Sequence, residues 1–364
     1  MMYHTELAAL HKINRYRSRT MYDEALVDFS SNDYLGFADN KALFQRAVNQ
    51  VSMYKSHAPK ASLLVNGYHP IHEEFENFLI RQSGFESAIV CGSGFLANFS
   101  LIEALPRKKD LLILDADYHA SGIIASKVLD AEVLFFNHND AHHLETLVKS
   151  HTYQRLIIAV EGIYSMSGDR VARAIFEVAD KYEALLIVDE AHSVGILGAH
   201  LSGVFEFYDI TPHANHIKMG TLSKALGSYG AYILCSEHIS DFLLNRAKAL
   251  IYTTAPSLFD IALGYQGFLY LLKNHALIKK EIEKRQAIIQ KYFSKSLCGL
   301  IFTYELKKNE DALLLQKHLL EEGFLVGAIR PPSVSKPILR IIPRLGESEE
   351  NLEHLCTLLL EGKT

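Results

Sequence analysis

The sequence has few cysteines, and their arrangement neither cross-links the chain nor suggests a ligand set. There are four, Cys91, Cys235, Cys298 and Cys356, with no CxxC pair among them. This scatter argues against a disulfide-framed secreted domain and against a structural zinc site. We therefore expect reduced thiols, a cytoplasmic location and no bound metal.

Long hydrophobic runs are also missing. No apolar run approaches the roughly 20 residues that a membrane-spanning helix requires. The opening stretch MMYHTELAALHKINRYRSR lacks the apolar centre of a secretion signal. We expect this stretch to form a surface helix, and we expect no membrane partner.

Positive charge is not in excess, because the formal net charge is −5. That balance argues against nucleic acid as the main partner. The letters DEAH at 189–192 also occur in helicases, but a helicase needs a GxxxxGK[ST] loop after an early strand. The only GKT is residues 362–364, without a glycine at the required spacing. The sequence thus predicts no nucleic-acid partner.

What is present indicates a globular protein with an α/β part. The chain has 364 residues, of which 49% are hydrophobic and 22% charged, enough for two domains. Between about residues 70 and 235, apolar runs alternate with helical periodicity, which predicts a largely parallel sheet. One helix should end at Gly84, and another should follow Asp169 as its N-cap. The predicted strands are 111–114, 133–136, 156–160, 185–188 and 231–235.

The pattern changes after about residue 255, where we predict a smaller α+β part. A long helix over about 257–295 should precede strands and a last helix that carries Leu352 and Leu355. The strands expected there are 300–305, 324–330 and 338–342. We therefore divide the chain into an N-terminal helix and arm (1–40), a large cofactor-binding domain (41–255), and a linking helix with a small C-terminal domain (256–364).

Two predicted strands end in polar residues, one at Glu161 and one at the DEAH letters. Ligands of open parallel sheets bind at the carboxyl ends of strands. Asp189 is therefore suited to pairing with a buried cationic nitrogen, although capping a helix would also explain it. His192 is equally compatible with a hydrogen-bonded core histidine.

Lys224 lies in TLSKALGSYG, between hydroxyl residues and glycines, with no other charge nearby. An isolated lysine is usually a surface residue, but a lysine amine in a suitable site forms a Schiff base with a carbonyl. GSGFLAN (92–98) precedes a helical pattern and could cradle a phosphate, with hydroxyls from Thr221, Ser223, Thr253 and Thr254. A phosphate cradle, a carboxylate and this lysine together fit pyridoxal phosphate.

Eight motifs in order resemble the α-oxoamine synthases, a branch of the fold-type I pyridoxal phosphate enzymes. They are FSSNDYLG (29–36), NGYHPIHEEFE (66–76), SGFLAN (93–98), DADYHAS (115–121), VEGIYSMSGD (160–169), VDEAHSVGILG (188–198), TLSKALGSYGA (221–231) and IRPP (329–332). The resemblance implies a transferase with a large domain, whose mostly parallel seven-stranded sheet is sandwiched by helices, and a smaller α+β domain.

The resemblance also implies roles around the cofactor. Lys224 matches the Schiff-base lysine, Asp189 the carboxylate on the pyridine nitrogen, and His119 the imidazole stacked on the ring; these three are the expected catalytic residues. His192 matches the partner of the phenolic oxygen. Further cofactor contacts match Gly94, Phe95, Ser165 and Thr221, and Thr253 and Thr254 match a pair that reaches the phosphate across a homodimer interface.

For the substrates, Arg340 matches the arginine that binds the amino-acid carboxylate, and Ser333 lies beside a possible acyl contact. One of Arg15, Arg17 and Arg19 corresponds to an arginine that touches the acyl substrate. The motifs are most similar to those of the branch that condenses L-alanine with a pimeloyl thioester of coenzyme A or acyl carrier protein, releasing CO2, in biotin biosynthesis.

The residues alone leave alternatives open, both within this branch and outside it. Within the branch, the chain could use glycine and acetyl-CoA or a longer acyl chain. An ordinary aminotransferase would share the lysine and aspartate and would convert a 2-oxo acid without releasing CO2. A non-catalytic regulator would need a fused DNA-binding module, for which residues 1–30 are too short.

Overall fold

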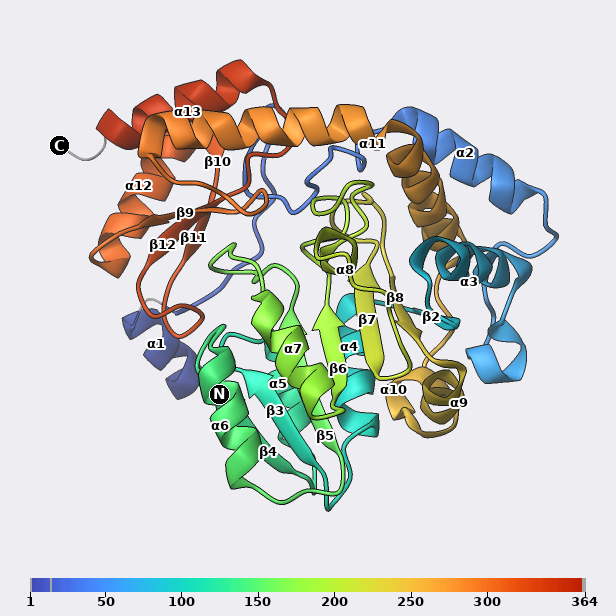
Figure 1. Ribbon diagram of the computed structural model, residues 1–364. Coiled ribbons are helices and arrows are strands. Elements are labelled where there is room, and N and C mark those ends of the chain that lie inside the picture. The colour runs from blue at the N-terminus through green and yellow to red at the C-terminus, as the bar shows by residue number, and fades with distance from the viewer. Residues whose placement is uncertain (1, 14, 362–364) are drawn as a thin grey trace.

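The computed structural model describes residues 2–13 and 15–361. Its centre is a seven-stranded sheet in the order β2-β8-β7-β6-β5-β3-β4 (Figure 1). Strand β8 runs antiparallel to both of its neighbours, and the other six strands share one direction. The strands are β2 (Ser87–Cys91), β3 (Leu111–Asp115), β4 (Glu132–Phe136), β5 (Leu156–Glu161), β6 (Leu185–Asp189), β7 (His216–Thr221) and β8 (Ala231–Cys235).

Helices cover both faces of this sheet, as the family resemblance implies. Because side chains alternate along a strand, Ile113 packs into the core on one face, and Leu112 and Leu114 pack into the core on the other. The first core is shared with α2 (Lys41–Ser52), α3 (Pro70–Ser83), α6 (Ala141–Ser150), α7 (Arg173–Lys181), α8 (Val204–Phe207) and α11 (Leu258–Phe293). The second is shared with α4 (Gly94–Ala104), α5 (Ala120–Ser126), α9 (Glu237–Arg246) and α10 (Lys248–Ile251).

A smaller sheet lies at the far end of the long helix α11 (Figure 1). It has three antiparallel strands in the order β11-β12-β9 and a core of its own, to which α11 contributes Ile288 and Ile289. The elements of this part are β9 (Phe302–Glu305), α12 (Asn309–Glu321), β11 (Gly327–Ile329), β12 (Ile338–Ile341) and α13 (Glu349–Glu361).

The segment that precedes α2, called the N-terminal arm here (residues 27–38), is held by the C-terminal part of the chain. Its strand β1 (Val27–Asp28) pairs with β10 (Phe324–Leu325). Farther along, Asp33 accepts a 2.6 Å ion-pair hydrogen bond from Arg344, and the carbonyl of Tyr34 accepts one from the amide of Leu345. This anchoring carries Asn32 and Tyr34 toward the central sheet.

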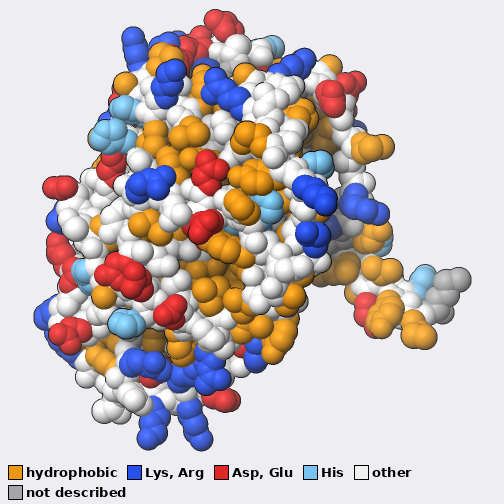
Figure 2. All heavy atoms as spheres, turned by 90° about the vertical axis from the view of Figure 1, so that its right-hand side faces the viewer, with side chains coloured by type: hydrophobic (Ala, Val, Ile, Leu, Met, Phe, Trp, Pro, Cys, Tyr) orange, Lys and Arg blue, Asp and Glu red, His pale blue; other side chains and the backbone are white. Residues whose placement is uncertain are grey.

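Helix α1 (His4–Lys12) is exposed along its whole length, as predicted for a surface helix. A segment at the right of the space-filling view in Figure 2 stands away from the body of the molecule. In residues 2–13 and 15–361, no helix has the length and apolar character needed to cross a membrane.

Two predictions need correction, and two strands were not foreseen. Asp169 is not the N-cap of α7, because the helix begins after Ala172 and the Asp169 carboxylate instead binds His138. The strand expected over 324–330 is interrupted at Val326, which separates β10 from β11. Strands β2 and β7 were not predicted; β7 carries His216 and Lys218, which disguise a buried strand. The division into domains at residues 40 and 255 stays a prediction.

Candidate active site

Three neighbouring strands of the central sheet end in polar residues at one edge. β5 ends at Glu161, β6 at Asp189 and β7 at Thr221, and Glu161 is the register partner of Asp189. A cavity of about 190 Å³ opens at this edge, and all three residues line it. Two larger hollows, of about 520 and 400 Å³, lie elsewhere. The chemistry of the lining rather than the size marks this cavity as the candidate site.

Lys224 reaches the cavity from the loop between β7 and β8. Its Nζ lies 2.7 Å from Nε2 of His192. Burial lowers the pKa of Lys224 to about 8, and the Arg340 cation acts in the same direction, whereas the carboxylates of Asp189 and Glu161 oppose the shift. The amine therefore loses its proton more readily than an ordinary lysine, as a nucleophile or base must.

Asp189 is buried, and each of its carboxylate oxygens accepts a hydrogen bond from protein. Oδ2 accepts one of 3.0 Å from Nδ2 of Asn98, and Oδ1 accepts one of 3.0 Å from the amide of Ala191. Burial raises the pKa of Asp189, and the Lys224 cation opposes that rise. A buried carboxylate of this kind is stabilised by a cationic partner in the cavity.

Glu161 is a second buried acid on the same cavity wall. Its Oε2 accepts a 3.0 Å hydrogen bond from the amide of Ser165, but Oε1 has no hydrogen-bond partner. Burial, with Asp189 adding to it, raises the pKa of Glu161 well above its ordinary value. A protonated Glu161 can therefore donate a hydrogen bond to a ligand in this cavity.

The amino end of α4 faces the cavity and suits an anion. Ser93 is the N-cap, and the amides of Gly94 and Phe95 belong to the open first turn of the helix. Thr221 and Ser223 lie opposite, with their hydroxyl oxygens 2.8 Å apart. The amides of Gly94 and Phe95 and the Ser223 hydroxyl are donors beside the cavity, whereas the Thr221 hydroxyl donates to the carbonyl of Gly230 at 2.9 Å. The phosphate contacts expected from the sequence stay predictions.

His119 caps α5 and lies on the cavity wall. Its Nδ1 is 2.7 Å from the Ser121 hydroxyl, which also accepts a 3.0 Å hydrogen bond from the Asn98 amide that holds Asp189. Burial lowers the pKa of His119, with Asp189 opposing that effect and Lys224 adding to it. The ring is therefore neutral at pH 7, which suits it for stacking on an aromatic ligand.

His192 connects Lys224 to the N-terminal arm. Its Nδ1 lies 2.5 Å from the hydroxyl of Tyr34, and its Nε2 faces the Lys224 amine. Burial, together with the nearby cations Lys224 and Arg340, lowers the pKa of His192 well below its ordinary value. His192 is thus a neutral imidazole with one N–H.

Arg340 arrives from β12 of the small sheet and is 7% exposed. Its Nη1 donates to Oδ1 of Asn32 at 2.9 Å, and its Nε donates to the carbonyl of Ser165 at 2.8 Å. Burial raises the pKa of Tyr34 to about 12, and the nearby Arg340 cation opposes that rise. A buried guanidinium held by neutral groups keeps its full charge for an anionic ligand.

The structure brings most of the predicted residues together and leaves others apart. Gly94, Phe95, His119, Asp189, His192, Thr221 and Lys224 line one cavity. Ser165 offers its carbonyl to Arg340 and is not part of the cavity wall. Thr253, Thr254 and Ser333 lie on loops away from the cavity, and Arg15, Arg17 and Arg19 are exposed in the segment that follows α1. The roles predicted for these residues stay predictions.

Sequence reasoning omitted four residues that the structure places in or beside the site. Asn32 and Tyr34 lie within FSSNDYLG, and Asn98 lies within SGFLAN, so each belongs to one of the family motifs. Glu161 was predicted only as a strand end, without a role. The only signal available was a polar or phenolic side chain within a motif, because their partners are distant in sequence.

Gly227 lies where the Lys224 loop meets the N-terminal arm. The residue has φ of +60°, and an added Cβ would lie 2.3 Å from the amide nitrogen of Ala38 and close to Phe37. The glycine therefore allows the Lys224 loop to pack against the N-terminal arm.

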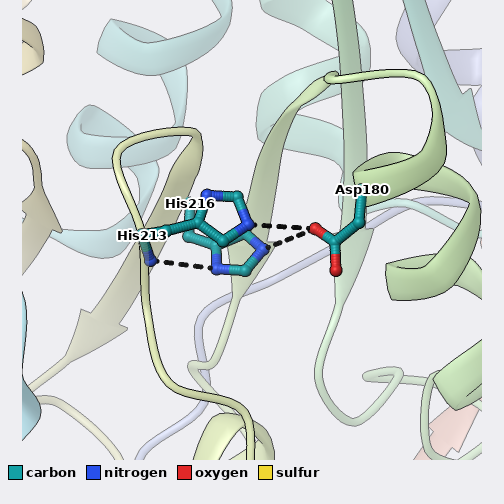
Figure 3. Close-up of side chains that lie close together, drawn as sticks. All are labelled: Asp180, His213 and His216. Atoms are coloured by element: carbon teal, nitrogen blue, oxygen red, sulfur yellow. Dashed lines mark hydrogen bonds and ion pairs between the residues drawn. The ribbon is translucent and has the colours of Figure 1, made fainter.

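A separate cluster, Asp180, His213 and His216, is the one group of possible metal ligands in the described part of the chain (Figure 3). It lies at the start of β7, whereas Thr221 ends that strand at the cavity. One oxygen of Asp180 lies 3.0 Å from Nε2 of His213 and 3.3 Å from Nε2 of His216. Nδ1 of each histidine accepts a hydrogen bond of 3.3 to 3.4 Å from a backbone amide. Since Nδ1 accepts, each Nε2 carries the ring proton, which a metal would have to displace.

The cavity groups fit pyridoxal phosphate. Lys224 offers an amine to an aldehyde, Asp189 a buried carboxylate to a ring nitrogen, and the α4 terminus several donors to a phosphate. Oε1 of Glu161, which has no hydrogen-bond partner, can form a further hydrogen bond with a ligand in the cavity. A small molecule that combines an aldehyde, a basic ring nitrogen and a phosphate engages all of these groups at once.

Comparison with known proteins agrees with this geometry. The sequence profile of the class I and II aminotransferases matches residues 24–359. The chain is 45% identical over 361 residues to an 8-amino-7-oxononanoate synthase of Helicobacter pylori, and the match covers 99% of this chain and 97% of that protein.

Solved structures resemble the whole fold. A serine palmitoyltransferase of Sphingomonas wittichii matches with a TM-score of 0.85 and 26% identity, over 93% of this chain and 87% of that one. A serine palmitoyltransferase from S. paucimobilis with bound PLP has a TM-score of 0.88 and 21% identity, over 98% and 96% of the two chains, a likeness that shows the fold alone. The fold-type I architecture predicted from the sequence is confirmed.

Proposed function

The chain belongs to the family of class I and II aminotransferases, in its α-oxoamine synthase branch, and we propose that it condenses L-alanine with a pimeloyl thioester. The products are 8-amino-7-oxononanoate, CO2 and the free thiol carrier. The protein is a pyridoxal phosphate-dependent enzyme. The reaction named for its relative in Helicobacter pylori supports this choice within the branch.

One observation carries the proposal: Arg340 of the small sheet donates a 2.8 Å hydrogen bond to the carbonyl of Ser165, and the amide of Ser165 donates one of 3.0 Å to Glu161, which lines the cavity with Lys224. An amine with a reduced proton affinity and a buried guanidinium suit an α-amino acid, whose carboxylate the guanidinium binds while its α-carbon stays near the amine. Asn32 completes a polar pocket for that carboxylate beside Arg340.

The residues have distinct tasks in this reaction. When bound, pyridoxal phosphate supplies an electron-withdrawing ring that stabilises negative charge on the α-carbon of the amino acid. Asp189 would keep the ring nitrogen of the bound cofactor protonated, and the amides of Gly94 and Phe95 with the Thr221 hydroxyl would hold its phosphate. Lys224 removes the α-proton of alanine and later returns a proton to the same carbon.

The remaining residues position the cofactor and the substrates. His119 would cover the ring of the bound cofactor, and Arg340 would fix the carboxylate of alanine until it leaves as CO2. We place Ser165 beside the cofactor and Ser333 beside the acyl substrate, which one of the exposed arginines that follow α1 also contacts. We also propose a homodimer, in which Thr253 and Thr254 of each protomer reach the phosphate in its partner. Four free thiols support a cytoplasmic enzyme.

The test is a substrate panel read by product mass. Purified enzyme loaded with pyridoxal phosphate is incubated with alanine or glycine and with pimeloyl, acetyl or palmitoyl thioesters of coenzyme A or acyl carrier protein. We expect 8-amino-7-oxononanoate from alanine and a pimeloyl thioester, with one CO2 released per product.

A Lys224→Ala variant is the control, because it keeps the cavity but lacks the base. It should give no product with any pair. Faster product formation from glycine with an acetyl thioester would contradict the proposed substrates. Conversion of a 2-oxo acid without CO2 would contradict the reaction type.

A further inference from the structure

A continuous row of buried groups joins Tyr34 to Lys224. The Tyr34 hydroxyl lies 2.5 Å from Nδ1 of His192, and Nε2 of His192 lies 2.7 Å from the Lys224 amine. Tyr34 is 1% exposed and His192 is 5% exposed. Solvent therefore does not compete for these hydrogen bonds.

The chemistry of the first member gives the row a direction. Among the described residues, Nδ1 of His192 is the one acceptor beside the Tyr34 hydroxyl, because the nearby Arg340 guanidinium has only donors. The single phenolic proton of Tyr34 is then available to Nδ1 of His192, which must accept it. A neutral imidazole whose Nδ1 accepts carries its own proton on Nε2. The N–H at Nε2 therefore points at Lys224.

We propose that Tyr34 is a positioning residue that fixes His192 in its Nε2–H form, so that His192 donates a hydrogen bond to the unprotonated amine of Lys224. The inference rests on the function proposed above only in naming Lys224 as the reactive amine. It assigns Tyr34 no contact with substrate or cofactor.

The effect on Lys224 has a definite sign. An Nε2–H donor favours the neutral amine and repels an ammonium, whereas an Nε2 lone pair would accept from the ammonium and favour it. The other charged or titratable groups that face this amine are Asp189 of β6, Glu161 of β5, Arg340 of β12 and His119 of α5. None of them is altered when only the Tyr34 hydroxyl is removed.

The test uses the cofactor-free protein, because the free amine can then be titrated directly. Lys224 is labelled with a small amine-specific acylating reagent between about pH 6 and about pH 11, and the labelled peptide is counted by mass spectrometry. In Tyr34→Phe, Nδ1 is free to take the ring proton and Nε2 becomes an acceptor. We expect the labelling midpoint to move upward by about one pH unit.

Tyr304→Phe is the matched control, because it too removes the hydroxyl of a buried tyrosine. The Tyr304 hydroxyl donates a hydrogen bond to the carbonyl of Leu359, far from the cavity. Its Lys224 midpoint should stay at the wild-type value. An unchanged or lower midpoint in folded Tyr34→Phe would overturn the proposal.

A second measurement does not depend on the folding of Tyr34→Phe. Nitrogen-15 spectra of histidine-labelled wild-type protein distinguish a protonated Nε2 from a protonated Nδ1, and His192→Gln identifies the signal of His192. We expect the proton on Nε2, and a proton on Nδ1 would overturn the proposal. Both measurements omit substrate and cofactor, so their failure differs from a failure of the substrate panel.

Discussion

At the scale of single residues, the cavity combines acids and bases whose proton affinities are shifted by burial. Asp189 and Glu161 gain proton affinity, and Lys224 and His192 lose it. Such shifts bring an amine and two acids toward the range in which proton transfer at neutral pH is fast.

Replacement of Asp189 by asparagine should separate cofactor binding from turnover. The amide keeps the size of the carboxylate but carries no charge to hold a protonated ring nitrogen. We expect condensation to fall by on the order of 10²-fold or more, with most of the cofactor retained as measured by its visible absorbance. Asp110→Asn, a buried aspartate paired with Arg155 at the other end of β3, is the control. Equal turnover in Asp189→Asn and in the control would show that Asp189 does not have the proposed role.

Replacement of Arg340 by alanine should act mainly on the amino acid. The loss of charge-assisted hydrogen bonds to its carboxylate should raise the KM for alanine by about 10²-fold. The KM for the thioester should change little. Arg340→Lys should give an intermediate KM for alanine, because lysine keeps the positive charge but lacks the paired N–H donors of the guanidinium.

The control for Arg340 is Arg155→Ala, which removes a cation paired with Asp110 away from the cavity. Its kinetic constants should match those of the wild type. A larger effect of Arg340→Ala on the thioester than on alanine would reassign this residue to the acyl site.

Single residues were predictable where a motif fixes chemistry in one short segment. Lys224, Asp189 and His192 are each marked by a motif, and the structure places all three around one cavity. Tyr34 could not be placed beside them, because its partner His192 is 158 positions away and only the fold brings them together. The close contact of Gly227 with the distant N-terminal arm was not predictable for the same reason.

At the scale of elements, the hairpin of residues 163–170 links the two sheets. Its ends pair through a bridge between Ile163 and Arg170, and Ser165 within it accepts the Arg340 hydrogen bond. His138 anchors it, with Nδ1 2.8 Å from Asp115 and Nε2 2.9 Å from Asp169.

His138 must be protonated on both nitrogens, because carboxylates only accept. The hydrogen bonds from His138 to Asp115 and Asp169 raise the pKa of His138 to about 10 although burial opposes them. The ring thus bridges two carboxylates as a cation and holds the hairpin against the end of β3.

His138→Gln should loosen this hairpin and weaken the protein in a pH-dependent way. Since the pKa is raised on folding, the stabilisation is complete below about pH 6.5 and is lost as the pH rises through about 10. We expect the variant to lose about 2 kcal/mol of unfolding free energy at pH 6. Denaturant unfolding at several pH values between about 5 and about 10 measures the difference, which should shrink toward the alkaline end.

The same variant should raise the KM for alanine severalfold, because Ser165 no longer holds Arg340 firmly. His142→Gln, which alters an exposed histidine on α6, serves as the control. A pH-independent loss of stability would show that His138 contributes packing alone.

Elements were predictable where one pattern dominated. Strands β3, β5 and β6 are uninterrupted apolar runs, and α3 ends at Gly84 in a left-handed conformation as predicted. Strand β7 was missed because Lys218 is buried in it, where its ammonium donates to the carbonyl of Ser202. Asp169 resembles an N-cap by position, but the charge of His138, which is distant in sequence, competes for it.

At the scale of the whole molecule, the homodimer proposed above requires an exposed surface near Thr253 and Thr254, and apolar side chains are exposed there. Figure 2 shows hydrophobic side chains gathered on the side of the molecule that carries α2 and α3. The short helical segment Leu63–Gly67 and the loop after α10 are joined by a hydrogen bond from Ala255 to Ala61. Leu64, Val65, Tyr68 and Tyr252 are exposed on these segments, beside Thr253 and Thr254.

A complementation experiment tests whether this surface joins two protomers with shared sites. Lys224→Ala and the double variant Thr253→Ala, Thr254→Ala should each be nearly inactive. If each site takes its lysine from one protomer and its threonines from the other, mixing them after mild dissociation should restore about a quarter of wild-type activity.

The control mixes Lys224→Ala with Asp189→Asn. Since both residues of a site come from the same protomer, each site of the mixed dimer carries one of the two changes, and this mixture should stay nearly inactive. Sedimentation of the wild type should give twice the 41.0 kDa chain mass. A monomer with full activity would contradict the shared site.

The two-part architecture was predictable from the change in pattern near residue 255, but the path of the N-terminal arm was not. The arm has little secondary structure, and its contacts are with residues about 300 positions away, such as Asp33 with Arg344. Periodicity reports local order and contains no signal for such contacts.

That arm also dictates when the enzyme becomes competent during its synthesis. Asn32 and Tyr34 leave the ribosome long before Lys224, yet the strand and turn that hold them, β10 and residues 342–346, emerge after almost everything else. A nascent chain halted at about residue 320 would already contain the lysine and the aspartate of the cavity. It would lack the residues that hold the arm in place. The last tenth of the chain to be translated therefore completes a site to which the first tenth contributes Asn32 and Tyr34.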